Sequence, residues 1–262
     1  MIETRHNGLF SLRFERLTAV GLRHGVFSRL GGVSEGIYAS LNLSRSTGDA
    51  AEPVRENRRR MFEALGTTPE LSLTSWLTHS NRVRVIASGA LRDKPHSDDT
   101  HADAMITRAR GLALTLRFAD CVPILLYDPA RGVIGITHAG WLGIENGVLG
   151  ETVRAMREAF DCAPQDVLAG IGPSIGPTRF EVGEDVAARI QAAVPEPVVL
   201  RHEGAPRPHV DLWRAAAAQL RASGVREIET AAVCTASDTA RWFSHRAEKG
   251  RTGRFGVAVV LD

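Results

Sequence analysis

Near its middle the chain reads Val122-Pro123-Ile124-Leu125-Leu126-Tyr127, then Asp128-Pro129-Ala130-Arg131-Gly132, then Val133-Ile134-Gly135-Ile136-Thr137. The two apolar runs are typical of strands, and the Asp, Pro and Gly residues between them are typical of a hairpin loop. A hairpin pairs its strands antiparallel, so at least part of the sheet is antiparallel. The pattern therefore predicts an α+β fold rather than a doubly wound parallel sheet.

The same hairpin indicates which side chains face each other. If the turn is centred on Ala130, Cys121 and His138 lie opposite or nearly opposite, with Cβ atoms about 5 Å apart. Pro123 weakens this pairing because it removes a ladder donor, although an edge or a strand start tolerates proline. Two interpretations stay open: a pair that binds metal or forms a thiolate–imidazolium couple, and a buried cysteine near a hydrogen-bonded histidine.

Apolar periodicity and capping residues predict the other elements. The expected helices are Pro53–Leu65, Ile144–Phe160, Glu184–Val194 and Asp211–Ser223. The expected strands outside the hairpin are Val83–Ile86, Leu112–Leu116, Val167–Ile171, Ile228–Val233 and Val257–Leu261. No repeat or long linker interrupts them, so we expect residues 1–262 to form a single domain.

The charges of the chain nearly cancel. Its 32 Lys and Arg residues stand against 30 Asp and Glu residues, and the two signs are mixed along the sequence. This balance argues against nucleic acid or a membrane surface as a partner. There is no long apolar run and no signal-peptide pattern, so we expect a cytoplasmic protein. The chain has three cysteines, Cys121, Cys162 and Cys234, and this odd number at wide, irregular spacing is not typical of a disulfide framework.

His79, within Ser75-Trp76-Leu77-Thr78-His79-Ser80, is a third candidate ligand. A lone histidine in such a place is more often a surface or hydrogen-bonded residue. With Cys121 and His138 it completes a set of two imidazoles and one thiolate, which in catalytic zinc sites leaves the fourth position to water. The same donors can hold copper.

Seven motifs follow one another along the chain: Arg23–Gly36, Ser40–Leu43, Glu56–Arg58, Ala119–Pro123, His138–Trp141, Ile171–Gly176 and Phe180–Gly183. In this order they resemble the laccase-domain family, from about Arg23 to Leu261. Its members are also labelled multicopper polyphenol oxidase, purine nucleoside phosphorylase and peptidoglycan editing factor.

The resemblance implies a β-sandwich-like arrangement of mixed sheets flanked by helices, related to the deamidating-toxin type of cysteine hydrolase. It also implies a zinc site formed by His79, Cys121 and His138. Relatives usually read Gln-Val-His-Gly where this chain has Leu77 to Ser80, and they carry arginine where it has Leu142 and Ala247. The loss of these two arginines argues against phosphate binding, because guanidinium groups are the usual bidentate partners of phosphate.

Other polar residues are candidates for substrate binding and proton transfer. Asp103 and Asp120 are candidate acid–base groups, and Asp120 can alternatively orient a ligand imidazole. The candidate phosphate-binding cations are Arg29, Arg45, Arg58 and Arg246.

The first functional hypothesis is a zinc-dependent purine nucleoside phosphorylase that also deaminates adenosine and phosphorolyses methylthioadenosine. Its partners are then purine nucleosides and phosphate. The alternatives are a cysteine hydrolase that edits peptidoglycan precursors, with Cys121 as nucleophile and His138 as base, and a copper-dependent polyphenol oxidase. The absence of any His-x-His pair among nine histidines argues against multicopper chemistry. A non-enzymatic zinc-binding or partner-binding protein is a further alternative, and the sequence leaves the oligomeric state open.

Overall fold

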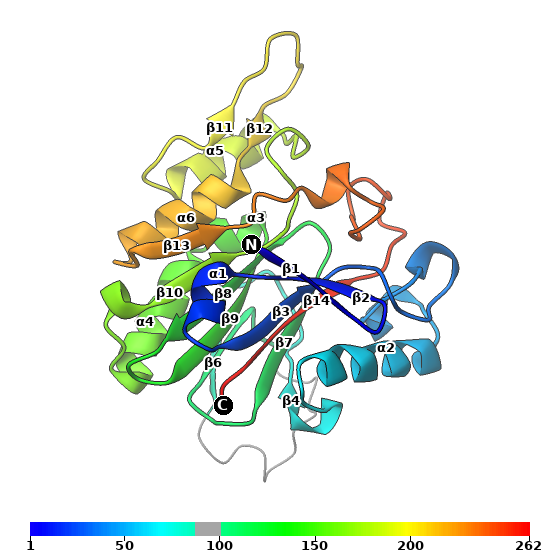
Figure 1. Ribbon diagram of the computed structural model, residues 1–262. Coiled ribbons are helices and arrows are strands. Elements are labelled where there is room, and N and C mark those ends of the chain that lie inside the picture. Colours follow the sequence, from blue (N-terminus) through cyan, green and yellow to red (C-terminus); the bar gives the residue numbers. More distant parts are fainter. Residues whose placement is uncertain (87–100) are drawn as a thin grey trace.

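Two six-stranded sheets face each other in the computed structural model, which describes residues 1–86 and 101–262 (Figure 1). In spatial order, the first sheet contains β1 (Ile2–His6), β2 (Leu9–Arg13), β3 (Arg23–Phe27), β14 (Phe255–Val260), β7 (Ala113–Phe118) and β4 (Ser72–Leu73). The second contains β13 (Glu227–Thr230), β10 (Leu168–Ile171), β8 (Val122–Asp128), β9 (Val133–Ala139), β6 (Ala104–Thr107) and β5 (Val83–Ile86). A two-stranded ribbon consists of β11 (Val199–Leu200) and β12 (His209–Val210). The α+β sandwich expected from the sequence is confirmed.

The predicted hairpin is strands β8 and β9, which pair antiparallel. Asp128 Oδ1 accepts hydrogen bonds from the backbone N–H groups of Ala130 and Arg131, and this fixes the loop. The register differs slightly from the predicted one, because Pro123 rather than Cys121 lies opposite His138. Cys121 comes two residues before Pro123 and therefore lies diagonally across from His138.

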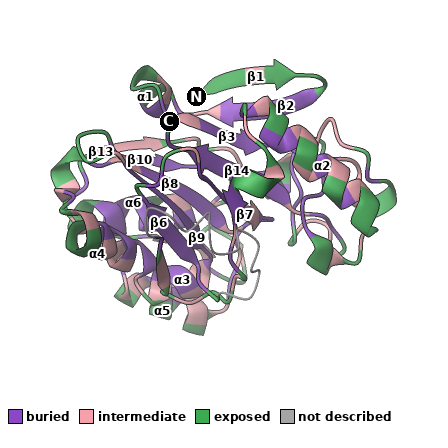
Figure 2. Cartoon of the chain, turned by 90° about the horizontal axis from the view of Figure 1, so that it is seen from below, coloured by how far each residue is buried: buried purple, intermediate pink, exposed green. Residues whose placement is uncertain are grey.

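Successive side chains of each strand point to opposite faces of its sheet, so the core consists of three apolar layers. Leu125 and Ile136 of the second sheet meet Leu116 and Val257 of the first sheet in the middle layer. The intervening residues of β8 face the opposite way, where the helices cover them. Figure 2 shows that the inner strands such as β8, β9 and β7 are buried, whereas the edge strand β1 is largely exposed. The molecule is thus built as helix, sheet, sheet and helix layers.

Helices lie on the outer faces of both sheets. Helix α2 (Ala51–Ala64) covers the first sheet through Met61 and Phe62. The short helix α1 (Glu15–Ala19) instead packs Leu17 into the middle layer and contacts β3 of the first sheet and β10 of the second. The helices of the second sheet are α3 (Trp141–Glu145), α4 (Val148–Phe160), α5 (Glu184–Ala192) and α6 (Leu212–Ala222). The predicted helix Ile144–Phe160 is therefore wrong as one continuous element, because Gly147 has φ +70° and separates α3 from α4.

The other predicted elements are confirmed with small shifts at their ends. Asp211 caps α6 by accepting a hydrogen bond from the backbone N–H of Arg214, as the sequence predicts. Short 3-10 turns occur at Gly36–Tyr38, Arg45–Thr47, Pro69–Leu71, Pro164–Asp166 and Thr235–Ser237. The sequence prediction missed these turns, as well as β1, β2, β3, β4, β6, α1 and the β11–β12 ribbon.

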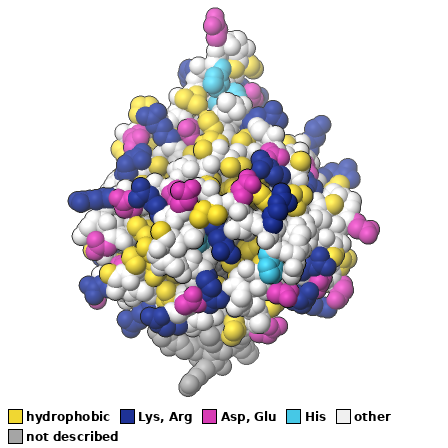
Figure 3. Space-filling model, in the orientation of Figure 1, with side chains coloured by type: hydrophobic (Ala, Val, Ile, Leu, Met, Phe, Trp, Pro, Cys, Tyr) yellow, Lys and Arg dark blue, Asp and Glu magenta, His cyan; other side chains and the backbone are white. Residues whose placement is uncertain are grey.

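The surface agrees with the near-zero net charge. On the face shown in Figure 3, basic and acidic side chains are interspersed and form no extended patch of one sign. Within residues 1–86 and 101–262, no helix combines the length and the apolar character that crossing a bilayer requires.

Candidate functional site

Three residues from separate segments converge at one end of the sandwich. His79 lies between β4 and β5, Cys121 immediately precedes β8, and His138 lies near the end of β9. Their potential ligand atoms all lie within 4.8 Å of one another, and Cys121 Sγ is 4.0 Å from His79 Nε2. His138 is buried and His79 is exposed, so the cluster opens to solvent on the His79 side.

The chain passes from one sheet to the other just before Cys121. Strand β7 belongs to the first sheet and β8 to the second, so residues Ala119 to Cys121 form the crossing. Asp120 has φ +84° and His79 has φ +58°. Non-glycine residues rarely adopt this left-handed conformation, and such strain concentrates at functional sites.

Asp103 holds both histidines in place. Its Oδ1 atom is 3.0 Å from His138 Nδ1 and accepts a hydrogen bond from the backbone N–H of His79 at 3.0 Å. Its Oδ2 atom accepts from the backbone N–H groups of Thr78 and Ser80 and from both of their hydroxyls. The contact with His138 Nδ1 leaves Nε2 of that ring to face the cluster.

The electrostatics of the cluster favour a thiolate beside an imidazolium. Burial raises the pKa of the Cys121 thiol, but the His138 charge and hydrogen bonds from both histidines outweigh burial and bring that pKa to about 6. Burial lowers the pKa of His138, but the Cys121 thiolate and Asp103 outweigh it and raise that pKa to about 9. Burial likewise raises the pKa of Asp103, yet hydrogen bonds from His138 and Ser80 hold it well below its usual range.

The three residues lie in a cavity of about 470 Å³, which we call the histidine cavity. Guanidinium groups, aromatic rings and hydroxyls line it. The cationic residues are Arg117, Arg246 and Arg254, the aromatic residues are Trp76, Trp141 and Phe180, and the hydroxyl residues are Ser44 and Ser46. Such a mixture of convergent polar groups and apolar walls is typical of a small-molecule site.

Of the four arginines predicted to bind substrate, only Arg246 lines the histidine cavity. Its guanidinium lies 5.3 Å from the centre of the Phe180 ring and donates to the Glu181 carbonyl. Arg29 instead forms an ion pair with Glu248 and stacks on Phe243. Arg45 and Arg58 line a different cavity, beside α2.

Asp120 lines the histidine cavity, but its carboxylate contacts neither histidine ligand. Oδ1 accepts a hydrogen bond from the Thr235 hydroxyl at 2.6 Å, and Oδ2 accepts from the backbone N–H of Arg246 at 2.6 Å. The imidazole-orienting role considered for Asp120 therefore falls to Asp103. Asp120 instead connects the Cys121 segment to the segment that carries Arg246.

The sequence prediction missed Arg117, Arg254 and the aromatic wall. Arg117 directly follows the predicted strand Leu112–Leu116 and lies within β7, and a charge between the apolar residues Leu116 and Phe118 is a signal that could have singled it out. Arg254 precedes β14 without any such pattern around it. Trp76 is 47% exposed at this site, which is unusual for so large an apolar side chain.

Known proteins are similar to this chain in sequence over nearly its whole length. A purine nucleoside phosphorylase of Bacteroides thetaiotaomicron is 36% identical over 259 residues, which cover 95% of this chain and 96% of that protein. A purine nucleoside phosphorylase of Deinococcus radiodurans is 37% identical over 246 residues, which cover 94% of this chain and 92% of that protein.

Solved structures show the same fold. The crystal structure of YlmD from Geobacillus stearothermophilus matches with a TM-score of 0.90 at 31% identity and covers 98% of this chain and 97% of that one. That of the Bacillus licheniformis hypothetical protein YfiH matches with a TM-score of 0.87 at 28% identity, again with 98% and 97% covered. The family model described as multi-copper polyphenol oxidoreductase laccase matches residues 23–262, and the chain belongs to this family.

Proposed function

We propose that this protein is a metal-dependent purine nucleoside phosphorylase of the cytoplasm, with zinc as its metal. One observation carries the proposal: the His79, Cys121 and His138 cluster lies in the same cavity as three arginines and three aromatic rings. The curated relatives in Bacteroides thetaiotaomicron and Deinococcus radiodurans are named purine nucleoside phosphorylase, which supports the same reaction class.

The cluster fits a tetrahedral metal ion. Zinc binds imidazole nitrogen and thiolate sulfur at about 2.0 to 2.3 Å and so holds its ligand atoms roughly 3.5 Å apart. The Cys121 Sγ to His79 Nε2 distance of 4.0 Å needs only a small closure to reach this. A Cβ atom on Gly140 would lie 3.0 Å from both Cys121 Sγ and His79 Cδ2, so glycine keeps this space clear. Copper accepts the same donors.

In phosphorolysis, a phosphate oxygen forms a bond to C1′ of the ribose while the bond from C1′ to the purine N9 breaks. Arg117, Arg246 and Arg254 bind the phosphate dianion and place it beside the sugar. The rings of Trp76, Trp141 and Phe180 pack against the purine. The metal, when bound, supplies a positive charge that polarises the substrate.

Two finer activities belong to the same proposal. Methylthioadenosine is a purine nucleoside with an apolar 5′ group, and Leu77 and Ile175 give the cavity apolar surface for it. Deamination of adenosine replaces the exocyclic amine with oxygen from water and releases ammonia. Polyphenol oxidation is not proposed, because the parts of the chain that the structure describes hold a single cluster of three or more potential metal ligands.

Metal analysis coupled to product chromatography tests the proposal. The purified protein is incubated with inosine, adenosine or methylthioadenosine, each with and without phosphate. We expect about one zinc per chain and free purine base that forms only when phosphate is present. A fully metal-loaded protein that releases no base from any of the three nucleosides would contradict it.

A second candidate function rests on the alignment of Cys121, His138 and Asp103. A thiol whose pKa is about 6 lies beside an imidazole that is itself held by a buried carboxylate. This is the arrangement of a cysteine hydrolase. Cys121 Sγ attacks an amide carbonyl carbon, His138 protonates the leaving amine, and water then cleaves the thioester, as in the editing of peptidoglycan precursors.

The two candidates differ in what they require of the metal. A metal-bound thiolate is a poor nucleophile, so the hydrolase is active only without metal. Mass spectrometry of metal-free protein mixed with an acylated peptidoglycan fragment checks for a thioester on Cys121. Its detection, together with inertness of the metal-loaded protein toward nucleosides, would favour the hydrolase.

A further inference from the structure

A second pair of histidine rings lies on the β11–β12 ribbon, and neither ring lines the histidine cavity. His209 is the first residue of β12, and His202 follows the end of β11 by two residues. The loop that joins the two strands projects from the body of the molecule (Figure 1). Figure 3, in the same orientation, shows histidine at the surface of this projection. The side chain of His202 is exposed, so the pair is open to solvent on that side.

The two rings are arranged like the histidine rings of the candidate metal site. The centres of the His202 and His209 rings are 5.0 Å apart, and the ring planes are inclined at 74°. The rings of His79 and His138 are also 5.0 Å apart, at 75°, and their ligand atoms lie within 4.8 Å of each other. Ring centres at this spacing allow one nitrogen of each imidazole to bind a single ion.

His209 also carries a polar atom without a partner. Its Nδ1 atom is buried, and none of the residues that the structure describes forms a hydrogen bond with it. Buried ring nitrogens are normally satisfied, so an unpaired one points to a group that the polypeptide does not supply. Imidazole binds metal ions through either ring nitrogen. The ring of His202 likewise has no hydrogen bond or ion pair within residues 1–86 and 101–262, so an ion displaces no such partner.

The backbone holds both histidines in place. His202 begins a tight turn, in which the Ala205 N–H donates to the His202 carbonyl at 3.1 Å. His209 pairs with Leu200 across the ribbon and forms a bridge with Glu181 on its other side. Ligands that are fixed before an ion arrives lose less conformational entropy when it binds. The pair is therefore suited to binding rather than being two mobile surface residues.

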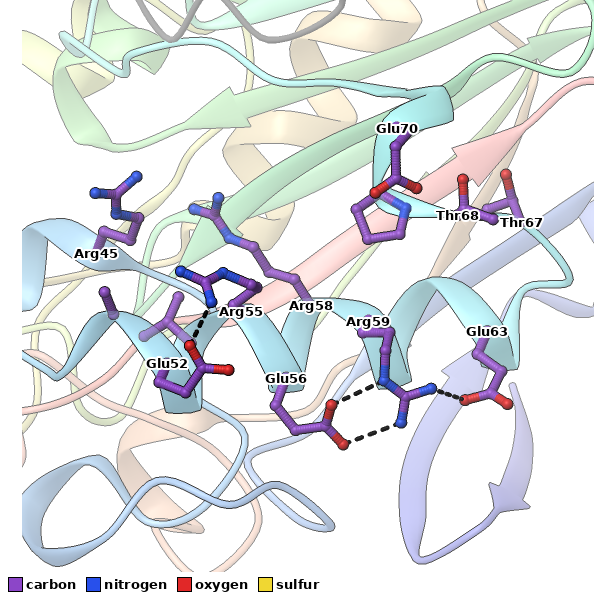
Figure 4. Close-up of a pocket in the computed structure, with 13 residues that line it drawn as sticks. Arg45, Glu52, Arg55, Glu56, Arg58, Arg59, Glu63, Thr67, Thr68 and Glu70 are labelled. Carbon is purple, nitrogen blue, oxygen red and sulfur yellow. Dashed lines mark hydrogen bonds and ion pairs between the residues drawn. The ribbon is translucent and has the colours of Figure 1, made fainter.

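The charged groups along α2 provide a contrast. The cavity beside α2 is lined by equal numbers of arginines and glutamates, and Arg59 pairs there with Glu56 at 2.8 Å and Glu63 at 2.9 Å (Figure 4). Such neighbours three or four residues apart neutralise each other on a helix surface. That cavity therefore shows no preference for a charged ligand, whereas the two rings on the ribbon have unused ligand atoms.

We propose that His202 and His209 bind a divalent transition-metal ion through one nitrogen of each ring. Imidazole donors suit ions such as Cu²⁺, Ni²⁺ and Zn²⁺, whereas Ca²⁺ and Mg²⁺ prefer oxygen ligands. Two protein ligands leave the other coordination positions to water. The exposed carboxylate of Glu203, which follows His202 in the turn, adds negative charge beside the ion. The site is separate from the histidine cavity, and the inference does not depend on the reaction proposed above.

Titration with Cu²⁺, followed by electron paramagnetic resonance, tests the proposal on the intact chain. His202→Gln and His209→Gln each remove one ligand, and His6→Gln is the matched control. His6 is also exposed, but its ring contacts the Asn7 side chain rather than a second histidine. Every variant keeps the metal-ligand cluster of the histidine cavity, so copper bound there contributes equally to all of the spectra.

We expect the wild type and His6→Gln to bind one more copper ion per chain than His202→Gln, with a spectrum that shows two nitrogen ligands. Removal of one of the two protein ligands should weaken binding of this ion at least about tenfold. Because His202 is exposed, its replacement leaves the core intact, and this variant decides the test if His209→Gln misfolds. Equal stoichiometry and affinity in the wild type and His202→Gln would overturn the proposal, and so would an equal loss of copper in His6→Gln.

Discussion

Asp103 is the residue on which the placement of both histidines depends. Its carboxylate contacts the ring of His138 and the backbone of His79. Replacing it by asparagine keeps the size but removes one acceptor and the negative charge. We expect Asp103→Asn to lower metal affinity about 10- to 100-fold, as is typical for outer partners of ligand histidines. Competition with a chromophoric chelator measures this.

The matched control is Asp120→Asn, which changes a second buried carboxylate, one that lines the histidine cavity. Asp120 binds Thr235 and the backbone of Arg246 rather than a histidine. Its replacement should leave metal affinity near that of the wild type and raise the KM for phosphate. If both variants lose metal equally, a general loss of structure rather than the Asp103 contacts explains the effect.

Cys121 contributes the thiolate of the proposed metal site. Cys121→Ala removes one of three ligands, so metal content and nucleoside turnover should be lost together. Cys234→Ala is the control, because Cys234 Sγ accepts a hydrogen bond from Gly176 outside the cluster. Elemental analysis beside an activity assay checks the prediction. Full turnover by metal-free Cys121→Ala would contradict it.

The Cys121 thiol should also titrate unusually early. Its pKa is lowered to about 6, so the reactive thiolate predominates above about pH 6 and is lost below it. In protein freed of metal by a chelator, the rate of alkylation by iodoacetamide should therefore rise through about pH 6. His138→Gln removes the stabilising charge and should move this midpoint upward. An unchanged midpoint in that variant would show that His138 is not the cause.

At the scale of elements, helix α5 contacts helix α3 and so holds Trp141, which is part of the wall of the histidine cavity, in place. Arg189 of α5 hydrogen-bonds Glu145 of α3 through two nitrogens, at 2.5 and 2.6 Å, and lies 5.0 Å from the centre of the Trp141 ring. Trp141 lines the cavity. Arg189→Leu should loosen this ring and raise the KM for nucleosides about two- to fivefold, with little change in kcat.

Steady-state kinetics with inosine measure this, and Arg154→Leu is the control. Arg154 of α4 forms similar ion pairs with Glu151 and Glu158 but is not among the residues that line the histidine cavity. Equal changes in KM for both variants would mean that the aromatic contact has no specific role.

Element boundaries show what local sequence can and cannot predict. The β8–β9 hairpin follows from its own turn residues, and α6 follows from its own cap at Asp211. The break at Gly147 escaped prediction because the apolar face continues through it from Ile144 to Val148, both of which are buried. Strand β4 has only two residues, too few for any periodicity to appear.

At the scale of the whole molecule, the three apolar layers share strands. Ala258 and Val260 face α2, whereas Val257 and Val259 of the same strand face the other sheet. We therefore propose that residues 1–262 form a single domain and predict one cooperative unfolding transition. Far-ultraviolet circular dichroism and tryptophan fluorescence should give coincident melting curves. Two separated transitions would contradict a single folding unit.

Prediction of the site depended on sequence distance. Cys121 and His138 belong to one hairpin, so local spacing brought them together. His79 and Asp103 join them only through the packing of separate strands. His79 was a candidate ligand by residue type, and only the family resemblance implied that it joins the other two. The arginines show the limit most clearly: Arg246 lies in the histidine cavity while Arg29 lies elsewhere, and local sequence does not distinguish them.

The crossing of the chain at Ala119 to Cys121 divides the histidine cavity between two sheets. Arg117 and Arg254 belong to the first sheet or its approach, whereas Cys121 and His138 belong to the second. The distance between these arginines and the Cys121 thiolate therefore depends on how far apart the two sheets are held by the apolar side chains packed between them, which include Leu125 and Val257. Removal of a methyl group from this core, far from any substrate, can therefore lower the catalytic rate even though every side chain that lines the cavity is unchanged.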